Sequence, residues 1–224
     1  MDYLDATIDS MENSRFVALY GGLVRELTAT THFSQTDINC LLMVYYKFAK
    51  VNGPNAKQMT KVQFYELFLV LFKVSNVTTI ERTLFAVTKD AKYVSPRAWV
   101  QLFCLYTTED LSVRMRFAFD IYDTKGTGLL DREQISMACD KFFVGEDEDE
   151  ITELRADMGE FLIKKFDVDK DGFISYEDYS TVVSEQPCLL EFLGQLFPSP
   201  YDCEILAHCI NMDSFLTVES GRLN

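Results

Sequence analysis

The sequence predicts an all-α protein made of two lobes of paired helix–loop–helix motifs, followed by a C-terminal helical extension. Apolar residues recur at helical spacing along most of the chain, and strand-like alternation of apolar and polar residues is scarce. Residues that typically begin helices stand directly ahead of several of these apolar stripes. The chain has 224 residues, 48% of them hydrophobic, so it can bury a core without disulfides.

These signals divide the chain into four parts: an N-terminal segment at 1–33, a first lobe at 34–107, a second lobe at 108–185 and the extension at 186–224. The first residues are acidic and polar, without the basic and apolar stretches of a secretory signal. Apolar runs are far shorter than the roughly 20 residues that cross a bilayer, so we expect no membrane insertion. The six cysteines form no C-x-x-C pair, and the cytoplasm, where we expect the protein, keeps thiols reduced, so we interpret them as small apolar side chains.

Each helix predicted in the first lobe follows a Ser or Thr suited to cap its N-terminus. The caps and the apolar stripes behind them are Ser34 before 38–48, Thr60 before 64–72, Thr78 before 80–87 and Ser95 before 99–106. At the first three, an acidic or Gln residue three positions later completes the pattern of a capping box.

Four further helices are predicted in the second lobe. The first begins near Asp110, the second near Leu130, the third spans about 151–166, and the fourth spans about 176–184 and ends before Pro187. The run 145–150, G-E-D-E-D-E, precedes the third helix. Neighbouring like charges repel, so this run is either a solvated loop or the exposed first turn of that helix.

The residues at 167–178, D-V-D-K-D-G-F-I-S-Y-E-D, have oxygen ligands at the spacing that binds a hard divalent cation. Gly172 permits the sharp turn that brings alternate side chains to one point. The predicted metal ligands are the carboxylates of Asp167, Asp169 and Asp171, the carbonyl of Phe173, Ser175 directly or through a water, and Asp178.

Position twelve of this loop is unusual. Asp178 stands where a bidentate Glu is common, and its side chain is one methylene shorter. It is therefore expected to reach the ion through one oxygen or through a water. Calcium is the predicted ion, with magnesium as an alternative at the same site, and calcium affinity should be lowered.

A second loop at 123–134, D-T-K-G-T-G-L-L-D-R-E-Q, has the spacing of a partner loop but has lost its chemistry. Three positions that should supply ligands no longer do so: Lys125, Thr127 and Gln134. We therefore expect a structural mate, joined to the intact loop through Leu130 and Ile174. The corresponding stretches of the first lobe are more degenerate, and neither is expected to bind calcium.

The intact loop identifies the chain as a member of the EF-hand superfamily, and further segments give a narrower resemblance. These are F-S-Q-T-D-I-N-C-L-L from Phe33, the helix of Trp99, the acidic insertion before the last loop, its final Asp, and L-L-E-F-L-G-Q-L-F-P-S-P from Leu189. Together they resemble the calaxin family, EF-hand proteins of ciliary axonemes. The resemblance implies a calcium-responsive component of the outer dynein arm, placed in the cytoplasm and the axoneme of a cilium or flagellum. It also implies a dynein heavy chain or outer-arm docking components as protein partners.

Two functions of different classes follow from the sequence. One is a calcium-dependent sensor that binds a partner helix and regulates a motor assembly, and the other is a constitutive structural adaptor whose metal site only stabilises the second lobe. Neuronal calcium sensors and calcineurin regulatory subunits share the two-lobed plan and are a further alternative. The net charge of −14 disfavours nucleic acid as a partner. With two histidines and no phosphate-binding loop, nucleophile elbow or zinc spacing, no enzyme activity and no catalytic residue are predicted.

The extension begins with six large apolar residues in nine positions, from Leu189 to Phe197. Such a surface would aggregate if it were exposed. We expect a helix at 188–197 that packs on the second lobe or between the lobes, and a further helix from Tyr201 to Met212. A permanent place in the core is favoured over displacement by calcium, because one weakened site supplies little differential binding energy.

Overall fold

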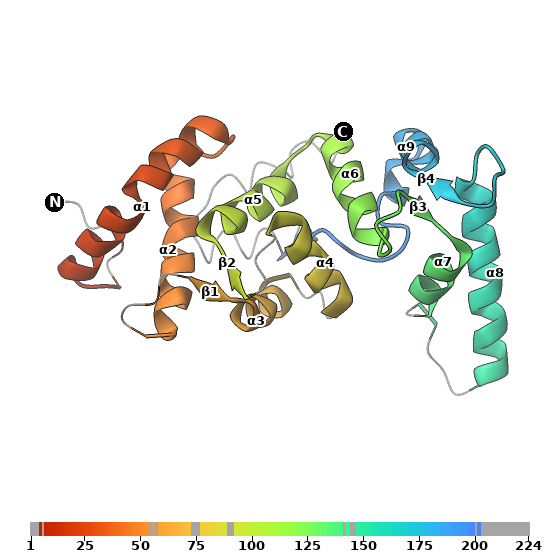
Figure 1. The fold of residues 1–224 in the computed structure, drawn as a ribbon, viewed down its shortest axis with the longest axis horizontal. Coiled ribbons are helices and arrows are strands. Elements are labelled where there is room, and N and C mark those ends of the chain that lie inside the picture. Colours follow the sequence, from red (N-terminus) through yellow and green to blue (C-terminus); the bar gives the residue numbers. More distant parts are fainter. Residues whose placement is uncertain are drawn as a thin grey trace. The chain divides into compact units, whose positions relative to one another are not determined.

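The computed structural model describes residues 5, 7–53, 56, 58–72, 77–88, 92–140, 142–143, 147–199 and 201–202. In this part of the chain the protein is all-α apart from short paired strands, which confirms the predicted fold class (Figure 1). It forms two compact units, one of Met1–Glu109 with Phe197–Asn224 and one of Asp110–Leu196. The division into four domains stays a prediction.

Within residues 7–107, the described part of the first unit holds two helix–strand–helix segments preceded by one further helix. Its elements are α1 (Ser10–Thr30), α2 (Gln35–Val51), β1 (Met59–Thr60), α3 (Lys61–Phe72), α4 (Val77–Val87), β2 (Tyr93–Val94) and α5 (Pro96–Thr107). The two strands pair antiparallel, with Met59 opposite Val94. This pairing joins the two segments in the way expected of paired helix–loop–helix motifs.

Three of the four caps predicted for this unit are present, whereas α4 begins at Val77, one residue before Thr78, so Thr78 lies within the helix and is not its N-cap. Ser34 forms the reciprocal capping box with Asp37, Thr60 exchanges the same hydrogen bonds with Gln63, and Ser95 caps α5. Trp99 of α5 lies in the core and donates its indole N–H to the Leu41 carbonyl at 3.0 Å.

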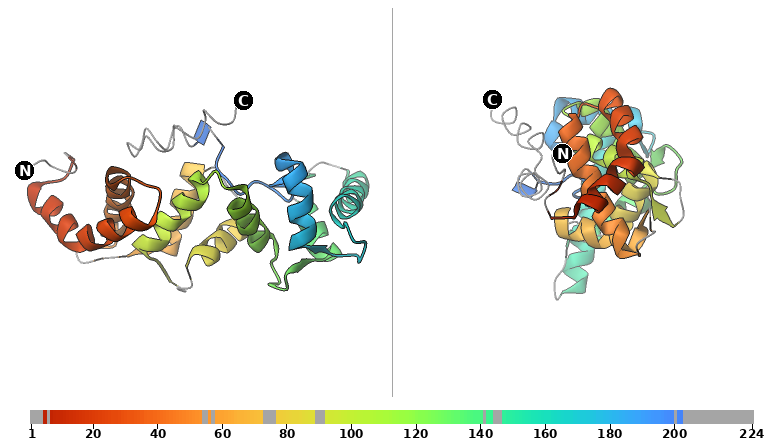
Figure 2. Two further views of the ribbon diagram at one scale, coloured as in Figure 1. Left: turned by 90° about the horizontal axis from the view of Figure 1, so that it is seen from above. Right: turned by 90° about the vertical axis from the view of Figure 1, so that its left-hand side faces the viewer.

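The N-terminal segment at 1–33, for which the sequence analysis predicts no helix, contains the helix α1. Its signals are nevertheless in the sequence. Asp9 caps the helix, and four buried residues follow at helical spacing: Phe16, Tyr20, Val24 and Leu27. This apolar face lies along α2, where the ring of Phe16 is 5.9 Å from that of Tyr46 (Figures 1 and 2).

Ion pairs fix the same N-terminal region to α2. Lys47 lies 2.5 Å from the Asp5 carboxylate, and Lys50 lies 2.9 Å from that of Glu12. Burial raises the pKa of Asp5, but hydrogen bonds from Lys47 and Thr7 outweigh it and lower this pKa to about 2. Asp5 is therefore held in its charged form by the fold.

The second unit contains the intact loop. Its elements are α6 (Leu111–Tyr122), β3 (Leu129–Leu130), α7 (Arg132–Cys139), α8 (Glu148–Phe166), β4 (Ile174–Ser175), α9 (Tyr176–Glu185) and the 3₁₀ turn η1 (Pro187–Leu189). The strands β3 and β4 pair through Leu130 and Ile174, as predicted. Asp147 caps α8, so the described end of the acidic run is the exposed first turn of the helix, where its negative charges complement the helix dipole.

The helix expected at 188–197 is not formed. Residues 190–193 are turns, and Gly194 has a φ of +115°, outside the range of a right-handed helix. The carbonyls of Leu190 and Gly194 instead accept hydrogen bonds from the hydroxyls of Tyr179 and Tyr122. The second predicted helix lies outside the described residues except for Tyr201 and Asp202, which are helical.

The packing expected of this segment is present even though the helix is not. Phe192 contacts three aromatic rings of the second unit: Tyr122, Phe166 and Tyr179. Leu190, Leu193 and Leu196 are buried. We call residues 190–196 the tail segment. No helix in the described residues is both long enough and apolar enough to cross a membrane.

Candidate metal site

The site lies in the loop that connects α8 to α9. Asp167 ends α8, with its N–H donated to the Ile163 carbonyl at 2.8 Å, and Ser175 caps α9. Both ends of the loop are thus held by helices, while β4 holds its middle against β3. The loop is a short, anchored turn on the surface of the second unit.

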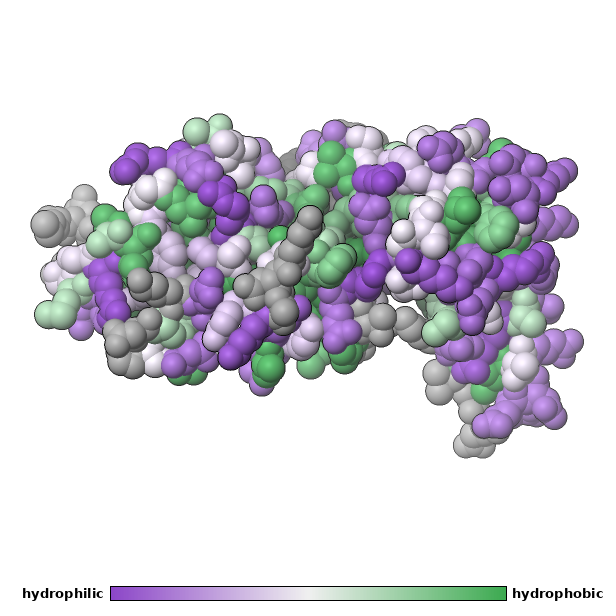
Figure 3. Space-filling model, in the orientation of Figure 1, coloured by the Kyte–Doolittle hydropathy of each residue, from purple (hydrophilic) through white to green (hydrophobic). Residues whose placement is uncertain are grey.

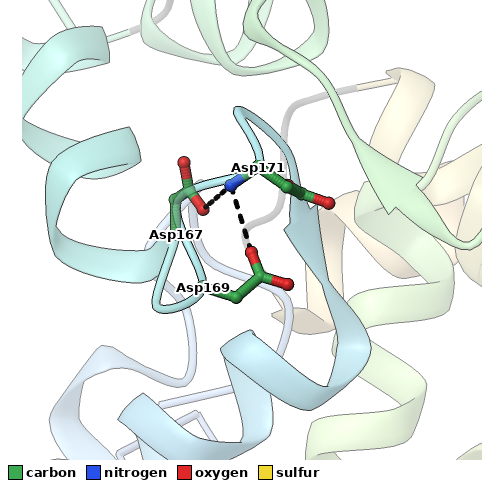
Figure 4. A group of neighbouring side chains, drawn as sticks. All are labelled: Asp167, Asp169 and Asp171. Atoms are coloured by element: carbon green, nitrogen blue, oxygen red, sulfur yellow. Dashed lines mark hydrogen bonds between the residues drawn. The ribbon is translucent and has the colours of Figure 1, made fainter.

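Three carboxylates come together in this loop. One oxygen from each of Asp167, Asp169 and Asp171 lies within 4.8 Å of the others, so one ion could contact all three (Figure 4). The backbone N–H of Asp171 donates to Asp167 at 3.1 Å and to Asp169 at 3.2 Å. These hydrogen bonds orient the carboxylates of Asp167 and Asp169 toward the backbone of Asp171.

The backbone of the loop requires a glycine at its sixth position. Gly172 has a φ of +90°, a conformation that residues with a Cβ rarely adopt. Its N–H donates to the second oxygen of Asp167 at 3.0 Å. Asp167 therefore organises the turn through both of its carboxylate oxygens.

The other predicted ligands are arranged differently. The N–H of Phe173 donates to Asp171 at 2.8 Å. Ser175 and Asp178 form a capping box, in which the Ser175 N–H and hydroxyl both donate to Asp178 Oδ2, at 2.9 and 2.6 Å. The carboxylate of Asp178 is not part of the three-carboxylate group. The structure thus brings the carboxylates of Asp167, Asp169 and Asp171 together and holds Asp178 at the start of α9, while the Phe173 carbonyl and Ser175 stay predicted ligands.

The donor set fits a hard divalent cation. Each converging group is a carboxylate, and calcium and magnesium both prefer oxygen ligands. Nitrogen and sulfur ligands, which zinc prefers, are not part of the group. Because Asp178 accepts hydrogen bonds from Ser175, the site offers fewer charged oxygens to a metal ion than a loop that ends in a bidentate Glu.

In the partner loop a lysine side chain supplies positive charge. The ammonium group of Lys125 lies 2.6 Å from Asp131 and 2.6 Å from Glu133. Asp123 accepts the N–H groups of Gly126 and Gly128, at 2.8 and 2.6 Å. The sequence showed that Lys125 removes a ligand, but not that the side chain pairs with the remaining acids of the loop.

Aromatic side chains pack beneath the intact loop. Phe166 directly precedes Asp167, and its ring centroid is 4.1 Å from that of Phe192 in the tail segment. Tyr179, just behind Asp178, donates its hydroxyl to the Leu190 carbonyl at 2.7 Å. Burial raises the pKa of Tyr179 well above its usual value, so this hydroxyl stays a donor. The apolar run in the sequence indicated burial here, but not which rings would meet.

Comparison with known proteins supports an EF-hand protein. The EF-hand domain pair family matches residues 112–184, which include both loops of the second unit. The chain is 28% identical over 174 residues to calaxin of Danio rerio, covering 75% of this chain and 81% of that protein. It is 26% identical over 175 residues to calaxin of Homo sapiens, covering 75% and 82%. For calaxin of Xenopus laevis the identity is 26% over 171 residues, with the same coverage of 75% and 82%.

Proposed function

We propose that this calaxin-like EF-hand protein is a calcium-responsive component of axonemal outer-arm dynein that controls the motility of cilia or flagella. The matches support a calcium-binding EF-hand protein. The observation that carries the calcium part is the convergence of three carboxylates in one EF-hand loop. The axonemal part rests on the similarity to calaxin.

The proposed partner is a protein, either a dynein heavy chain or an outer-arm docking component, and the proposed place of action is the axoneme. The protein acts as a regulator and not as an enzyme. His32 supports this reading, because it lies 2.9 Å from the Thr107 hydroxyl and burial lowers its pKa, as in a packed structural side chain. His208 lies outside the described residues.

The residues of the site define what calcium binding can change. A bound divalent cation supplies positive charge at the point where Asp167, Asp169 and Asp171 converge. These carboxylates repel one another, so neutralising them favours the closed turn between α8 and α9. Through the pair of Leu130 and Ile174, this turn is coupled to the partner loop.

A structural adaptor is the second candidate, and the tail segment favours it. Phe192 packs against Phe166 and Tyr179, so the aromatic surface behind the loop is already covered. A sensor that exposes this surface would have to displace Phe192, and the binding energy of a single metal site would have to drive that displacement.

Dye binding distinguishes the two functions. An apolar fluorescent dye is added to the full chain in magnesium buffer, with and without calcium, and the Asp167→Ala variant serves as control. A sensor shows a calcium-dependent change in dye fluorescence that the variant lacks, whereas an adaptor shows none. Localisation of a tagged chain in ciliated cells tests the axonemal part, and its exclusion from the axoneme would refute that part.

A further inference from the structure

The helix α8 has an apolar stripe that is not part of the core of its unit. Its core face consists of Gly159, Leu162, Ile163 and Phe166, which are buried. A second set recurs at i, i+3, i+7 and i+10: Ile151, Leu154, Met158 and Phe161. Leu154 is 42% exposed and Phe161 is 62% exposed. This spacing places the four side chains on one side of the helix, beside the core face.

An acidic row accompanies the stripe. Each apolar member is directly preceded by an exposed acid, which gives the set Glu150, Glu153, Asp157 and Glu160. Successive residues of a helix are 100° apart, so the acids form a second line alongside the first. We call the four apolar and four acidic residues together the α8 ridge.

The ridge is accessible. Figures 1 and 2 show that the N-terminal turns of α8 project beyond α7. The helix α7 packs beside the core face of α8, where Arg155 of α8 pairs with Asp140 and Arg132 of α7 pairs with Glu160, the last acid of the row. In Figure 3 the surface over this end of the unit is mostly hydrophilic, with hydrophobic patches between the polar groups.

The tail segment explains why a partner would need such a surface. Phe192 and Leu190 already occupy the aromatic face behind the metal loop. A partner helix can therefore bind without displacing the tail segment only if it uses another apolar face. The ridge is such a face, on the helix that leads directly into Asp167.

We propose that the α8 ridge docks a basic amphipathic helix of a partner protein, whose apolar side covers Leu154, Met158 and Phe161 and whose Lys or Arg residues pair with the acidic row. This proposal rests on the proposed function as a regulatory protein with a protein partner. The charge of the ridge selects the occupant: Glu160 is already paired with Arg132, and the line of Glu150, Glu153 and Asp157 favours cations at helical spacing.

Charge also argues against two other occupants. A second copy would bring its own acidic row and a net charge of −14. Residues 203–224 of this chain carry three acids and one base, so they lack the required cations. A basic partner is the only one of the three that compensates the acidic row.

The test measures binding of designed peptides to the full chain by fluorescence anisotropy. The probe is a helical 18-residue peptide with a stripe of Leu residues flanked by Lys residues. Two other peptides are tested in parallel: one in which Glu replaces each Lys, and one with the sequence of residues 203–224. We expect the Lys peptide to bind most tightly and to weaken as salt rises. Phe161→Gln should weaken it about tenfold. Phe85→Gln, at a phenylalanine that is 65% exposed on α4 of the first unit, should leave it unchanged.

The opposite results would overturn the proposal. Equal binding of the Lys and Glu peptides would exclude charge selection, and tighter binding of the 203–224 peptide would make the chain's own C-terminus the occupant. Dimerisation lost in Phe161→Gln but kept in Phe85→Gln would make the occupant a second copy. Calcium titration of the same samples distinguishes failure of this proposal from failure of the proposed function. If the ridge binds no peptide, calcium binding at the loop 167–178 is still retained.

Discussion

Replacing Phe192 by Ala tests whether the tail segment is a permanent part of the second unit. The ring of Phe192 lies 4.1 Å from Phe166, 5.4 Å from Tyr122 and 5.7 Å from Tyr179. The substitution removes all three contacts and leaves a void between the rings. We expect a lower free energy of unfolding for the second unit, without loss of the fold.

The size of the effect follows from the burial of Phe192. Phe-to-Ala substitutions at fully buried positions cost about 3–5 kcal/mol. Phe192 is half-buried, so we expect about 2–3 kcal/mol, including the loss of the aromatic pairs. The matched control is Phe161→Ala on α8, a residue that is 62% exposed and whose truncation should cost about 0.5 kcal/mol or less.

Urea unfolding of the full chain separates the two units. Trp99 is the single tryptophan and lies in the first unit, so its fluorescence follows that unit alone. Circular dichroism follows both units. With a slope of about 1–1.5 kcal/mol/M, Phe192→Ala should lower the midpoint of the second unit by about 2 M. The tryptophan transition should not move.

The result that would refute the reasoning is a Phe192→Ala variant no less stable than Phe161→Ala. The tail segment would then not pack on the second unit in solution, and the surface behind the metal loop would be open to a partner.

Three further predictions concern single side chains. Asp178→Glu should strengthen calcium binding in calorimetry, because the longer side chain can supply a second oxygen; weaker binding would contradict the explanation based on side-chain length. Lys125→Ala should leave one calcium site per chain, because Gln134 still lacks the required carboxylate, and a second site in calorimetry would show that the lysine alone blocks the partner loop. The pKa of Asp5 is lowered from 3.8 to about 2 by the fold, so its contribution to stability is full above pH 4 and is lost as the pH falls toward 2. Asp5→Asn should remove this pH dependence from acid unfolding of the first unit, followed by Trp99 fluorescence, and an unchanged profile would exclude the contribution.

Much of the fold could be predicted because its signals are local. Capping residues such as Ser34 and Ser95, followed by apolar stripes, mark helices whatever the rest of the chain does. The pairing of Leu130 with Ile174 followed from loop spacing alone. The signals of α1 are weaker: Asp9 and the spacing from Phe16 to Leu27 mark a helix, but other apolar residues lie between its four buried apolar positions and blur the stripe.

The remaining features depend on contacts between distant residues. The apolar run from Leu189 to Phe197 has helical spacing, yet hydrogen bonds from Tyr122 and Tyr179 and the φ of Gly194 hold the tail segment in turns. The spacing of the loop predicted that Asp167, Asp169 and Asp171 would converge. It did not show that Asp178 is engaged by Ser175, since that hydrogen bond forms where α9 begins.

Calcium titration of the full chain by calorimetry tests the central claim, that the protein has a single calcium site in the loop 167–178. We predict about one ion per chain with a Kd of order 10⁻⁶ to 10⁻⁴ M. Asp167→Ala should abolish this binding, because it removes one of the three converging carboxylates and the acceptor for Asp171 and Gly172. The control Asp157→Ala, at an exposed acid on α8, should retain it. Two or more ions per chain, or calcium binding that survives Asp167→Ala, would contradict the claim.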